Sequence, residues 1–385
     1  MRVAFYAPLK PPDHPVASGD RQLARALLDA MHAAGHEVFL ASRFRSFDAH
    51  GDASRQERLA QMGGRLAKRL VTRLQGTGRP DVWFTYHLYH KAPDWLGPPV
   101  SSALDIPYVV AEASVAAKQR NGRWGLGYAS SVAAVELAAA TLAFNPADMA
   151  AIRNVRGVAR AGDIVPPFLD LSAFAGPVTA SLPRRRDRDA PVRLITVAMM
   201  RPGAKLASYQ LLAAALARIV SPAWELVVVG DGPARAEVEA AFTGIKPPRV
   251  RFAGVQPANR VAALMRDSDL FLWPAIDEAF GMVFIEAQAC GLPVVAGNSG
   301  GVAAVVAAGR SGLLIPVGDV DAFAAATQTL LSNAALREQM GSEAEAYVRS
   351  RHDLPVAAAA IDSLLRHAVV DHAAAANSAR VEAAR

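Results

Sequence analysis

The feature that most constrains the fold is an alternation of apolar, strand-like runs with helix-like periodic segments. One such alternating series occupies each half of the chain. Leu23, Leu27 and Met31 follow helical spacing after the first strand, and the pattern stops at Gly35. Strands joined by helices favour parallel sheets, whose ligands gather where strand ends meet helix starts. We therefore predict an α/β fold of two tandem Rossmann-like, doubly wound domains. The expected strands are residues 3–7, 36–41, 81–87 and 106–114 in the first half, and 192–199, 224–230, 249–254, 269–275, 292–297 and 312–318 in the second.

The length of 385 residues exceeds what one hydrophobic core usually serves, since single cores stop growing before about 300 residues. The segment 181–191, SLPRRRDRDAP, has turn formers and charges but little to bury. A long helix is expected after Ser130, and the helical segment after Pro355 is expected to cross back to the first domain, with a frayed tail from His372. The predicted organisation is an N-terminal domain 1–167, a linker 168–191, a C-terminal domain 192–354 and a C-terminal helix 355–385.

Composition limits the protein class. Apolar residues make up 52% of the chain and there is one cysteine, which fits a globular protein and excludes a disulfide scaffold. Neither a secretory apolar region nor about 18 uninterrupted apolar residues can be found, so we expect a cytoplasmic protein in a reducing compartment. The net charge of +6 suits an acidic partner without choosing one, and we expect no nucleic acid partner.

The strongest local motif is DEAFGMVFIEAQACGLPVV, which follows an apolar strand. Gly281 opens a helix after Phe280, and the free N–H groups and dipole of a helix start favour a phosphate. Glu278 and Glu286 flank this start, and ionised carboxylates there would suit sugar and ribose hydroxyls. The alternative is that two acidic residues eight apart are simply solvated.

Two further features lie after strands of the second half. Arg201 and Lys205 follow its first strand, where two cations could neutralise a leaving diphosphate. Gly230 begins the segment GDGP, whose residue types indicate a turn; a place near a phosphate is the second interpretation. A solvated turn with ordinary basic residues is the alternative for the first feature.

Taken in order, these motifs resemble the family 4 glycosyltransferases, which are retaining enzymes of the GT-B fold. The resemblance rests on ELVVVGDGPAR, VRFAGVQPANRVAALMRDSDLFLWPA, the two-glutamate motif DEAFGMVFIEAQACGLPVVAGNSGG and GRSGLLIPVGDVDAFA, and it covers roughly residues 192–326. It implies two domains facing across a cleft and a hexosyltransferase (EC 2.4) that moves a sugar from a nucleotide-sugar donor. The acceptor would be a polysaccharide, a lipid-linked glycan or a small molecule.

The resemblance also implies roles for individual residues. Glu278 would contact the donor sugar, Glu286 the ribose, and Arg201 with Lys205 the diphosphate. The implied mechanism is front-face displacement, in which cations and a helix dipole stabilise the departing phosphate. It needs neither a protein nucleophile nor a metal, so we expect no cofactor. The other implied donor contacts are Phe280 and Gly281 at the diphosphate, Val255 near the nucleobase, Gly230, and Ser299, Gly300 and Gly301 at the sugar.

The sequence departs from the family pattern mainly on the acceptor side. Relative to the family pattern, Ala113 stands in place of a histidine after a first-domain strand, with Glu112 beside it, and His87 could supply the missing polar group. A packed, non-catalytic histidine is the alternative for His87. The other departures are Ser18-Gly19-Asp20 in place of a Gly-Gly pair, Leu206 after Lys205, and Ala275 after Pro274; Gly19, Asp20, His87 and Glu112 are the acceptor-side candidates.

A basic stretch in the first half suggests a membrane surface as a further partner. Nine Lys or Arg residues lie between Arg43 and Arg79, and apolar residues recur there at helical spacing. A basic amphipathic helix could bind anionic lipid at the inner face of the membrane, although a helix that covers its own core is the commoner outcome.

Two other functions are compatible with the sequence. One is an epimerase or phosphorylase on the same fold, and the other is a sugar-nucleotide-binding scaffold with impaired acceptor chemistry.

Overall fold

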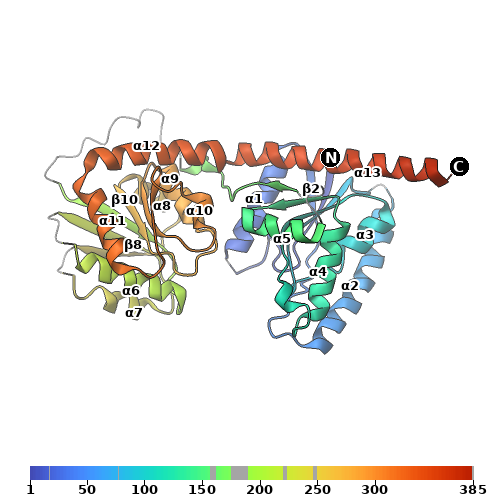
Figure 1. The fold of residues 1–385 in the computed structure, drawn as a ribbon, viewed down its shortest axis with the longest axis horizontal. Coiled ribbons are helices and arrows are strands. Elements are labelled where there is room, and N and C mark those ends of the chain that lie inside the picture. Colours follow the sequence, from blue (N-terminus) through green and yellow to red (C-terminus); the bar gives the residue numbers. More distant parts are fainter. Residues whose placement is uncertain are drawn as a thin grey trace. The chain divides into compact units, whose positions relative to one another are not determined.

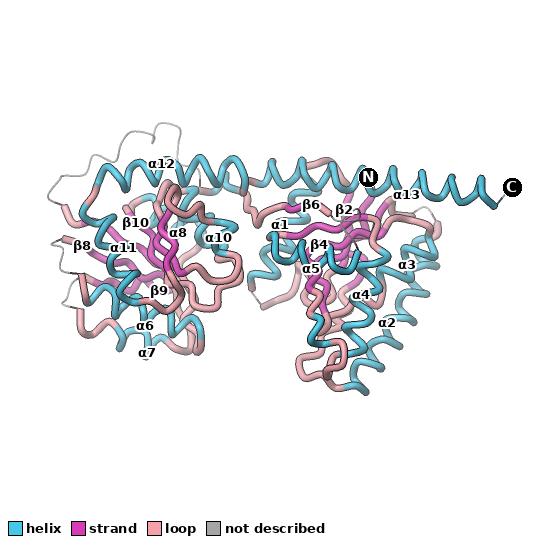
Figure 2. The backbone as a smooth tube through the Cα atoms, viewed as in Figure 1, coloured by secondary structure: helices cyan, strands magenta, loops and turns pink. Residues whose placement is uncertain are grey.

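Two six-stranded sheets organise the chain, and every pairing between their strands is parallel. The computed structural model describes residues 1–16, 18–76, 78–156, 162–174, 190–219, 223–245 and 249–383. The chain forms two compact units, Met1–Pro166 with Leu354–Arg385, and Pro167–Asp353. In each unit helices cover the strands, as Figures 1 and 2 show. The predicted α/β class is confirmed by these two sheets.

The sheet of unit 1 has the order β2-β1-β3-β4-β5-β6. Its central strands β1, β3 and β4 are rich in Val, Phe, Tyr and Ala and are buried on both faces, which is the pattern of a covered parallel sheet. Helix α13 returns to this unit and packs against α1. The elements are β1 Arg2–Tyr6, α1 Gly19–Ala33, β2 Glu37–Ser42, α2 Ala53–Leu74, β3 Val82–Tyr89, α3 Gly97–Leu104, β4 Tyr108–Ser114, α4 Gly125–Leu137, β5 Ala140–Ala143, α5 Pro146–Arg156, β6 Asp163–Ile164 and α13 Leu354–Ala383.

The sheet of unit 2 has the order β12-β11-β10-β7-β8-β9. Its core joins strand residues such as Leu194, Leu226 and Phe271 to Phe284 of α9 and Phe323 of α11. The elements are β7 Val192–Val197, α6 Ala204–Ala217, β8 Trp224–Val229, α7 Arg235–Ala241, β9 Val250–Gly254, α8 Ala258–Arg266, β10 Leu270–Trp273, α9 Met282–Ala289, β11 Val294–Gly297, α10 Val302–Val305, β12 Gly312–Ile315, α11 Val320–Ser332 and α12 Ala334–Arg351.

Three segments differ from the sequence-based expectation. The helix expected through 130–144 ends at Leu137, and β5 follows it, because an alanine-rich buried run does not reveal its period. The tail from His372 is helical to Ala383, and the His372 imidazole lies 3.1 Å from the Asp105 carboxylate. Of the expected linker 168–191, Leu169 and Leu171 are buried in the core of unit 2, and residues 175–189 lie outside the described residues.

A buried histidine fixes the two ends of unit 2 to each other. His352 Nδ1 lies 2.6 Å from the Pro167 carbonyl oxygen, and the Leu169 N–H donates to the His352 carbonyl. Burial lowers the pKa of His352 from 6.5 to about 4, so the imidazole is neutral at pH 7 and Nδ1 donates to Pro167. Protonation would place a positive charge on this buried ring, so the junction is most stable when His352 is neutral.

Acid should destabilise the protein through His352. Because the folded-state pKa is lower than the unfolded one, this group's contribution is present above pH 6.5 and is lost as the pH falls to about 4. The expected loss is about 3 kcal/mol of unfolding free energy. Urea unfolding at about pH 7 and pH 4 should show a smaller loss in His352→Gln, whose amide can still donate. An equal loss in both proteins would contradict the assignment.

Candidate donor and acceptor sites

The order of the strands in unit 2 marks one place for a ligand. After β7 the chain adds β8 and β9 on one side and then returns to place β10 on the other side of β7. The loops that leave neighbouring strands in opposite directions open a crevice at the carboxyl edge of the sheet, where ligands of doubly wound folds bind. The loop after β7 holds Arg201 and leads to Lys205 at the start of α6, and the loop after β10 holds Glu278.

Lys205 and Glu278 meet across this switch point. The Lys205 Nζ lies 2.5 Å from Glu278 Oε2, and Trp273 Nε1 donates to the same oxygen at 3.1 Å. Lys205 Nζ also lies 5.2 Å from the centre of the Trp273 ring. The two charged side chains keep 28% and 16% of their exposure, so a ligand can reach them while water is partly excluded. A carboxylate accepts several hydrogen bonds and an ammonium donates three, so both groups can still bind a ligand.

The loop that carries Glu278 has an unusual backbone. Ala275 and Asp277 have positive φ angles of 55° and 51°, which non-glycine residues rarely adopt. The Glu278 N–H donates to Ser299 Oγ at 3.2 Å, which ties this loop to the turn after β11. Strained backbone of this kind is retained where the surroundings fix it, often at functional sites. The departure at Ala275 therefore falls on a left-handed position of the loop.

Three glycines of the motif are required by close packing. A Cβ on Gly300 would lie 2.3 Å from the Glu278 carbonyl oxygen, and one on Gly301 would lie 2.4 Å from the Phe280 ring. Gly281, with φ of 71°, would place a Cβ 2.5 Å from the Phe284 ring. These glycines let the loop after β11 and the start of α9 approach the Glu278 loop.

Helix α9 begins next to this loop, as predicted. Gly281 is its N-cap and its carbonyl accepts from the Phe284 N–H. The N–H groups of Met282 and Val283, at the start of the helix, have no partner within the helix, so they can bind an anion. Glu286 lies in the second turn of α9 and is half-buried. The described structure thus places Glu278, Phe280 and Gly281 along one loop, with Glu286 on the helix that follows it.

The remaining donor-side candidates lie on neighbouring strand ends. The Gly230 N–H, after β8, donates to the Gly254 carbonyl at 2.9 Å, which brings the turn GDGP beside Val255. Val255 is 75% exposed, as a residue that stacks on a planar ligand would be. A Cβ on Gly230 would lie 1.9 Å from the Ala198 carbonyl oxygen, so this glycine serves packing. Arg201 is exposed beside the same edge, and its backbone carbonyl accepts from the Leu206 N–H.

The acceptor-side candidates of unit 1 also lie at a switch point. Strand β1 has β2 on one side and β3 on the other, and Asp20 begins α1 after β1 while His87 is near the end of β3. His87 Nδ1 lies 3.2 Å from Asp20 Oδ1 and 3.6 Å from Glu112 Oε2 of β4. His87 and Glu112 have positive φ angles of 61° and 56°. The structure therefore brings three of the four candidates together, and Gly19 adjoins them at the start of α1.

Charge controls the protonation of this cluster. Burial lowers the pKa of His87, but the carboxylates of Glu112 and Asp20 outweigh it, and the pKa is raised above 6.5. Burial raises the pKa of Glu112, whereas the contact with His87 lowers the pKa of Asp20. These shifts favour a protonated His87 beside an ionised Asp20.

Ala113 turns out to face away from this cluster. It is fully buried and pairs with Leu88 in the core, while Glu112 points to the opposite face and reaches His87. The polar groups at this end of β3 and β4 are therefore Glu112 and His87, and Ala113 belongs to the core. Sequence reasoning missed Trp273, which binds Glu278; its place as the last residue of an apolar strand before the acidic loop was the available signal.

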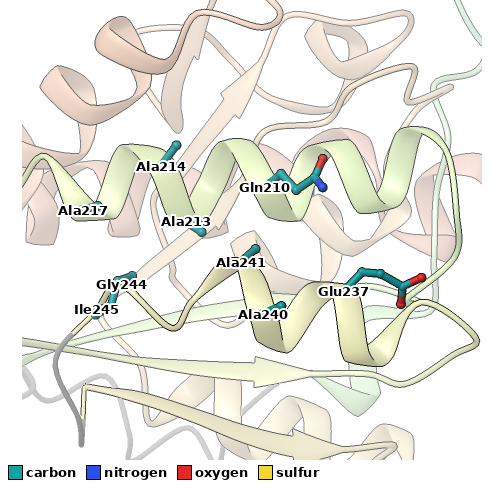
Figure 3. A pocket seen from close by; sticks show the side chains of 9 residues that line it. All are labelled: Gln210, Ala213, Ala214, Ala217, Glu237, Ala240, Ala241, Gly244 and Ile245. Atoms are coloured by element: carbon teal, nitrogen blue, oxygen red, sulfur yellow. The ribbon is translucent and has the colours of Figure 1, made fainter.

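A second hollow in unit 2 lies apart from these residues. A groove of about 530 Å³ runs between α6 and α7 and is lined mainly by alanine (Figure 3). On α6 its lining residues begin at Gln210, in a later turn than Lys205, and the others come from α7 and the residues just after it. Among the described residues, no cluster of His, Cys, Asp and Glu is arranged to hold a metal ion, and no helix is long and apolar enough to cross a membrane.

Comparison with known proteins agrees with the predicted resemblance. Residues 191–333 match the family model described as Glycosyl transferases group 1. A D-inositol 3-phosphate glycosyltransferase of Corynebacterium jeikeium is 32% identical over 196 residues, which are 48% of this chain and 46% of that protein. A sulfoquinovosyl transferase of Arabidopsis thaliana is 33% identical over 126 residues, 32% of this chain and 24% of that protein. The chain spans less than half the length of these relatives.

Solved structures match over nearly the whole chain. Anabaena HepE in complex with UDP superposes with a TM-score of 0.70 and 19% identity, covering 95% of this chain and 100% of that one. Sucrose-phosphate synthase from Thermosynechococcus elongatus superposes with a TM-score of 0.68 and 21% identity, covering 95% of this chain and 98% of that one. At this identity the likeness shows the fold. Residues 191–333 are therefore similar to the glycosyl transferases group 1, and the chain has the predicted GT-B fold.

Proposed function

We propose that this protein is a retaining glycosyltransferase that moves a sugar from a nucleoside-diphosphate sugar to a hydroxyl acceptor. The observation that carries the proposal is the contact of Lys205 with Glu278 beside the start of α9, at the switch point of the unit that matches the family. A cation, a carboxylate and a helix N-terminus together suit a diphosphate joined to a polyol. The UDP complex of HepE, which shares the fold, adds support for this class of donor.

In the proposed mechanism, Lys205 and Arg201 bind the diphosphate together with the amide groups at the start of α9. Glu278 accepts hydrogen bonds from sugar hydroxyls, and Glu286 accepts them from the ribose. As the bond from the anomeric carbon to the phosphate oxygen breaks, negative charge gathers on the leaving group, where these groups stabilise it. The acceptor oxygen bonds to the same carbon on the same face, and its proton passes to the leaving phosphate. This route requires no protein nucleophile and no metal.

The acceptor side of the proposal rests on the cluster of unit 1. Asp20 and Glu112 offer carboxylate oxygens to an acceptor hydroxyl, and His87 fixes both of them. Gly19 leaves the start of α1 open, since no atom lies within 4 Å of its missing Cβ.

The proposed compartment is the cytoplasm. The single cysteine is buried and needs no disulfide partner, which suits a reducing compartment.

Donor turnover tests the proposed function. Release of nucleoside diphosphate from UDP-, GDP- and ADP-sugars should occur with one of these donors, and Glu278→Ala and Glu286→Ala should abolish it. Glu237→Ala, a change on the exposed surface of α7, is the matched control and should turn over normally. If wild-type protein neither turns over a donor nor is thermally stabilised by one, the proposal fails and a scaffold role takes its place.

We also propose that α2 binds an anionic membrane surface at the cytoplasmic face. The helix is continuous through Gly63, whose missing Cβ lets Trp95 pack against it. Leu70 and Leu74 are buried in the unit's own core, so the outer face offers basic groups and the 43% exposed Met62. The exposed basic residues of α2 are Arg55, Arg58, Arg65, Lys68, Arg69 and Arg73.

Charge reversal on α2 should abolish vesicle binding. Each basic residue near an anionic surface contributes about 1 kcal/mol, so replacing Arg58, Arg65 and Arg69 by Glu should weaken partitioning by at least about 100-fold. Co-sedimentation with phosphatidylglycerol vesicles measures this, and phosphatidylcholine vesicles are the control. Wild-type protein that ignores the anionic vesicles would contradict the membrane proposal without touching the transferase one.

A further inference from the structure

Beyond the charged cluster of unit 1, a row of four rings continues from His87. The centre of the Tyr89 ring lies 5.1 Å from that of His87, His90 lies 5.3 Å from Tyr89, and Trp124 lies 5.6 Å from His90. We call His87, Tyr89, His90 and Trp124 the aromatic row. Its residues come from the end of β3 and from the start of α4, so the row lies along the carboxyl edge of the sheet.

The aromatic row is partly exposed while its members are held in place. All four side chains are half-buried. Trp124 Nε1 donates to the Asp48 carbonyl at 3.0 Å, and Lys91 Nζ lies 4.7 Å from the centre of the Trp124 ring. His90 Nδ1 is buried without a hydrogen-bond partner among the described residues. Burial, together with the charge of Asp20, raises the pKa of Tyr89 to about 12, so its hydroxyl stays protonated and can donate.

We propose that the aromatic row is a binding site for a glycan acceptor, with the reacting sugar at His87 and further sugars along Tyr89, His90 and Trp124. The apolar C–H face of a sugar ring is weakly positive and packs on the negative face of an aromatic ring. The planes of successive rings are inclined to each other by 45°, 77° and 73°, so a short glycan along the row would contact ring edges as well as ring faces. This inference rests on the proposed function and names its acceptor class.

Charge along the row defines which end of the glycan reacts. The His87 end carries Asp20 and Glu112, and Asp148 adds a negative potential there. Because like charges repel, a phosphate on the reacting sugar is disfavoured at this end. At the Trp124 end, Lys91 and Lys118 lower the pKa of His90 after the larger effect of burial, so the potential there is positive. An uncharged reacting sugar therefore suits the His87 end better than a phosphorylated one.

Saturation-transfer NMR on the full chain tests the subsite directly. The probes are neutral gluco-, galacto- and manno-configured disaccharides and, for comparison, hexose 6-phosphates. We expect transfer to a neutral disaccharide, and an affinity at least about tenfold weaker in Tyr89→Ala and Trp124→Ala. Tyr89→Phe, which keeps the ring, should retain most of the binding. Phe39→Ala is the matched control, because this half-buried aromatic residue of β2 packs beneath Arg2 instead.

The outcomes separate this inference from the proposed function. Circular dichroism on every variant shows whether it folds, and Tyr89→Phe keeps the test valid if an alanine variant does not. No transfer to any neutral disaccharide, unchanged binding in both alanine variants, or tighter binding of the phosphates would each overturn the subsite. Donor turnover is measured on the same samples without an acceptor: its absence would overturn the proposed function, while ring-dependent glycan binding would still support the subsite.

Discussion

Replacing Lys205 by methionine is expected to lower kcat/KM for donor turnover by about 10²- to 10³-fold while the protein stays folded. The reason is that Lys205 lies at the switch point of unit 2, where the leaving diphosphate gathers charge that the ammonium group stabilises. The ion pair with Glu278 is partly exposed, so its loss should cost only about 1 kcal/mol of stability. Steady-state release of nucleoside diphosphate measures the first effect and thermal unfolding the second.

Two further variants give this prediction its controls. Lys205→Arg keeps the charge and should retain more activity than the methionine variant, although its planar group fits Glu278 and Trp273 differently. Arg310→Met removes an exposed cation that pairs with Glu343 and should leave turnover unchanged. A kcat/KM for Lys205→Met within threefold of wild type would show that Lys205 does not bind the leaving group.

Replacing His87 by alanine is expected to lower transfer to an acceptor by about 10²- to 10³-fold and to leave acceptor-independent donor hydrolysis largely intact. His87 is the cation that holds Asp20 and Glu112 together, and without it two carboxyl groups would face each other unpaired. Glycan product and free sugar, measured in one assay by chromatography, separate the two reactions. An equal loss of both would contradict an acceptor-side role for His87.

The pH dependence of the cluster gives a second readout. The pKa of His87 is raised, so the contribution of the imidazolium to stability is complete below pH 6.5 and is lost as the pH rises through the raised value. The charge of Asp148 also acts on His87 and Glu112, and Tyr86 is hydrogen-bonded to Glu112. Acceptor KM should therefore rise on the alkaline side in wild type and become flat in His87→Ala. A profile that is the same in both proteins would remove His87 from acceptor binding.

The sequence predicted the parts of the fold and site that repeat a local pattern. The apolar strands and the helix starts after them follow from periodicity, and the order of β7, β10 and α9 places Glu278 and Gly281 at a carboxyl edge. β5 was not predicted, because four residues after an alanine-rich helix, three of them buried, have no period of their own. The roles of the individual site residues stay predictions.

What could not be predicted depends on distance and on backbone geometry. Lys205 and Glu278 are 73 residues apart, and spacing alone does not show that they form an ion pair. The positive φ angles at His87 and Glu112 redirect these side chains, which is why Ala113 appeared to be the altered position when Glu112 is the one that reaches the site. The aromatic row joins β3 to α4, which only the folded unit brings together.

The most direct test of the account is calorimetric titration of UDP, GDP and ADP into the wild-type protein, Glu286→Ala and Lys205→Met. The account predicts that one of the three nucleotides binds, and that each substitution weakens this binding at least about tenfold, because one removes the ribose contact and the other the diphosphate contact. No binding by any of the three nucleotides, or binding that both substitutions leave unchanged, would contradict the donor site at the switch point of unit 2.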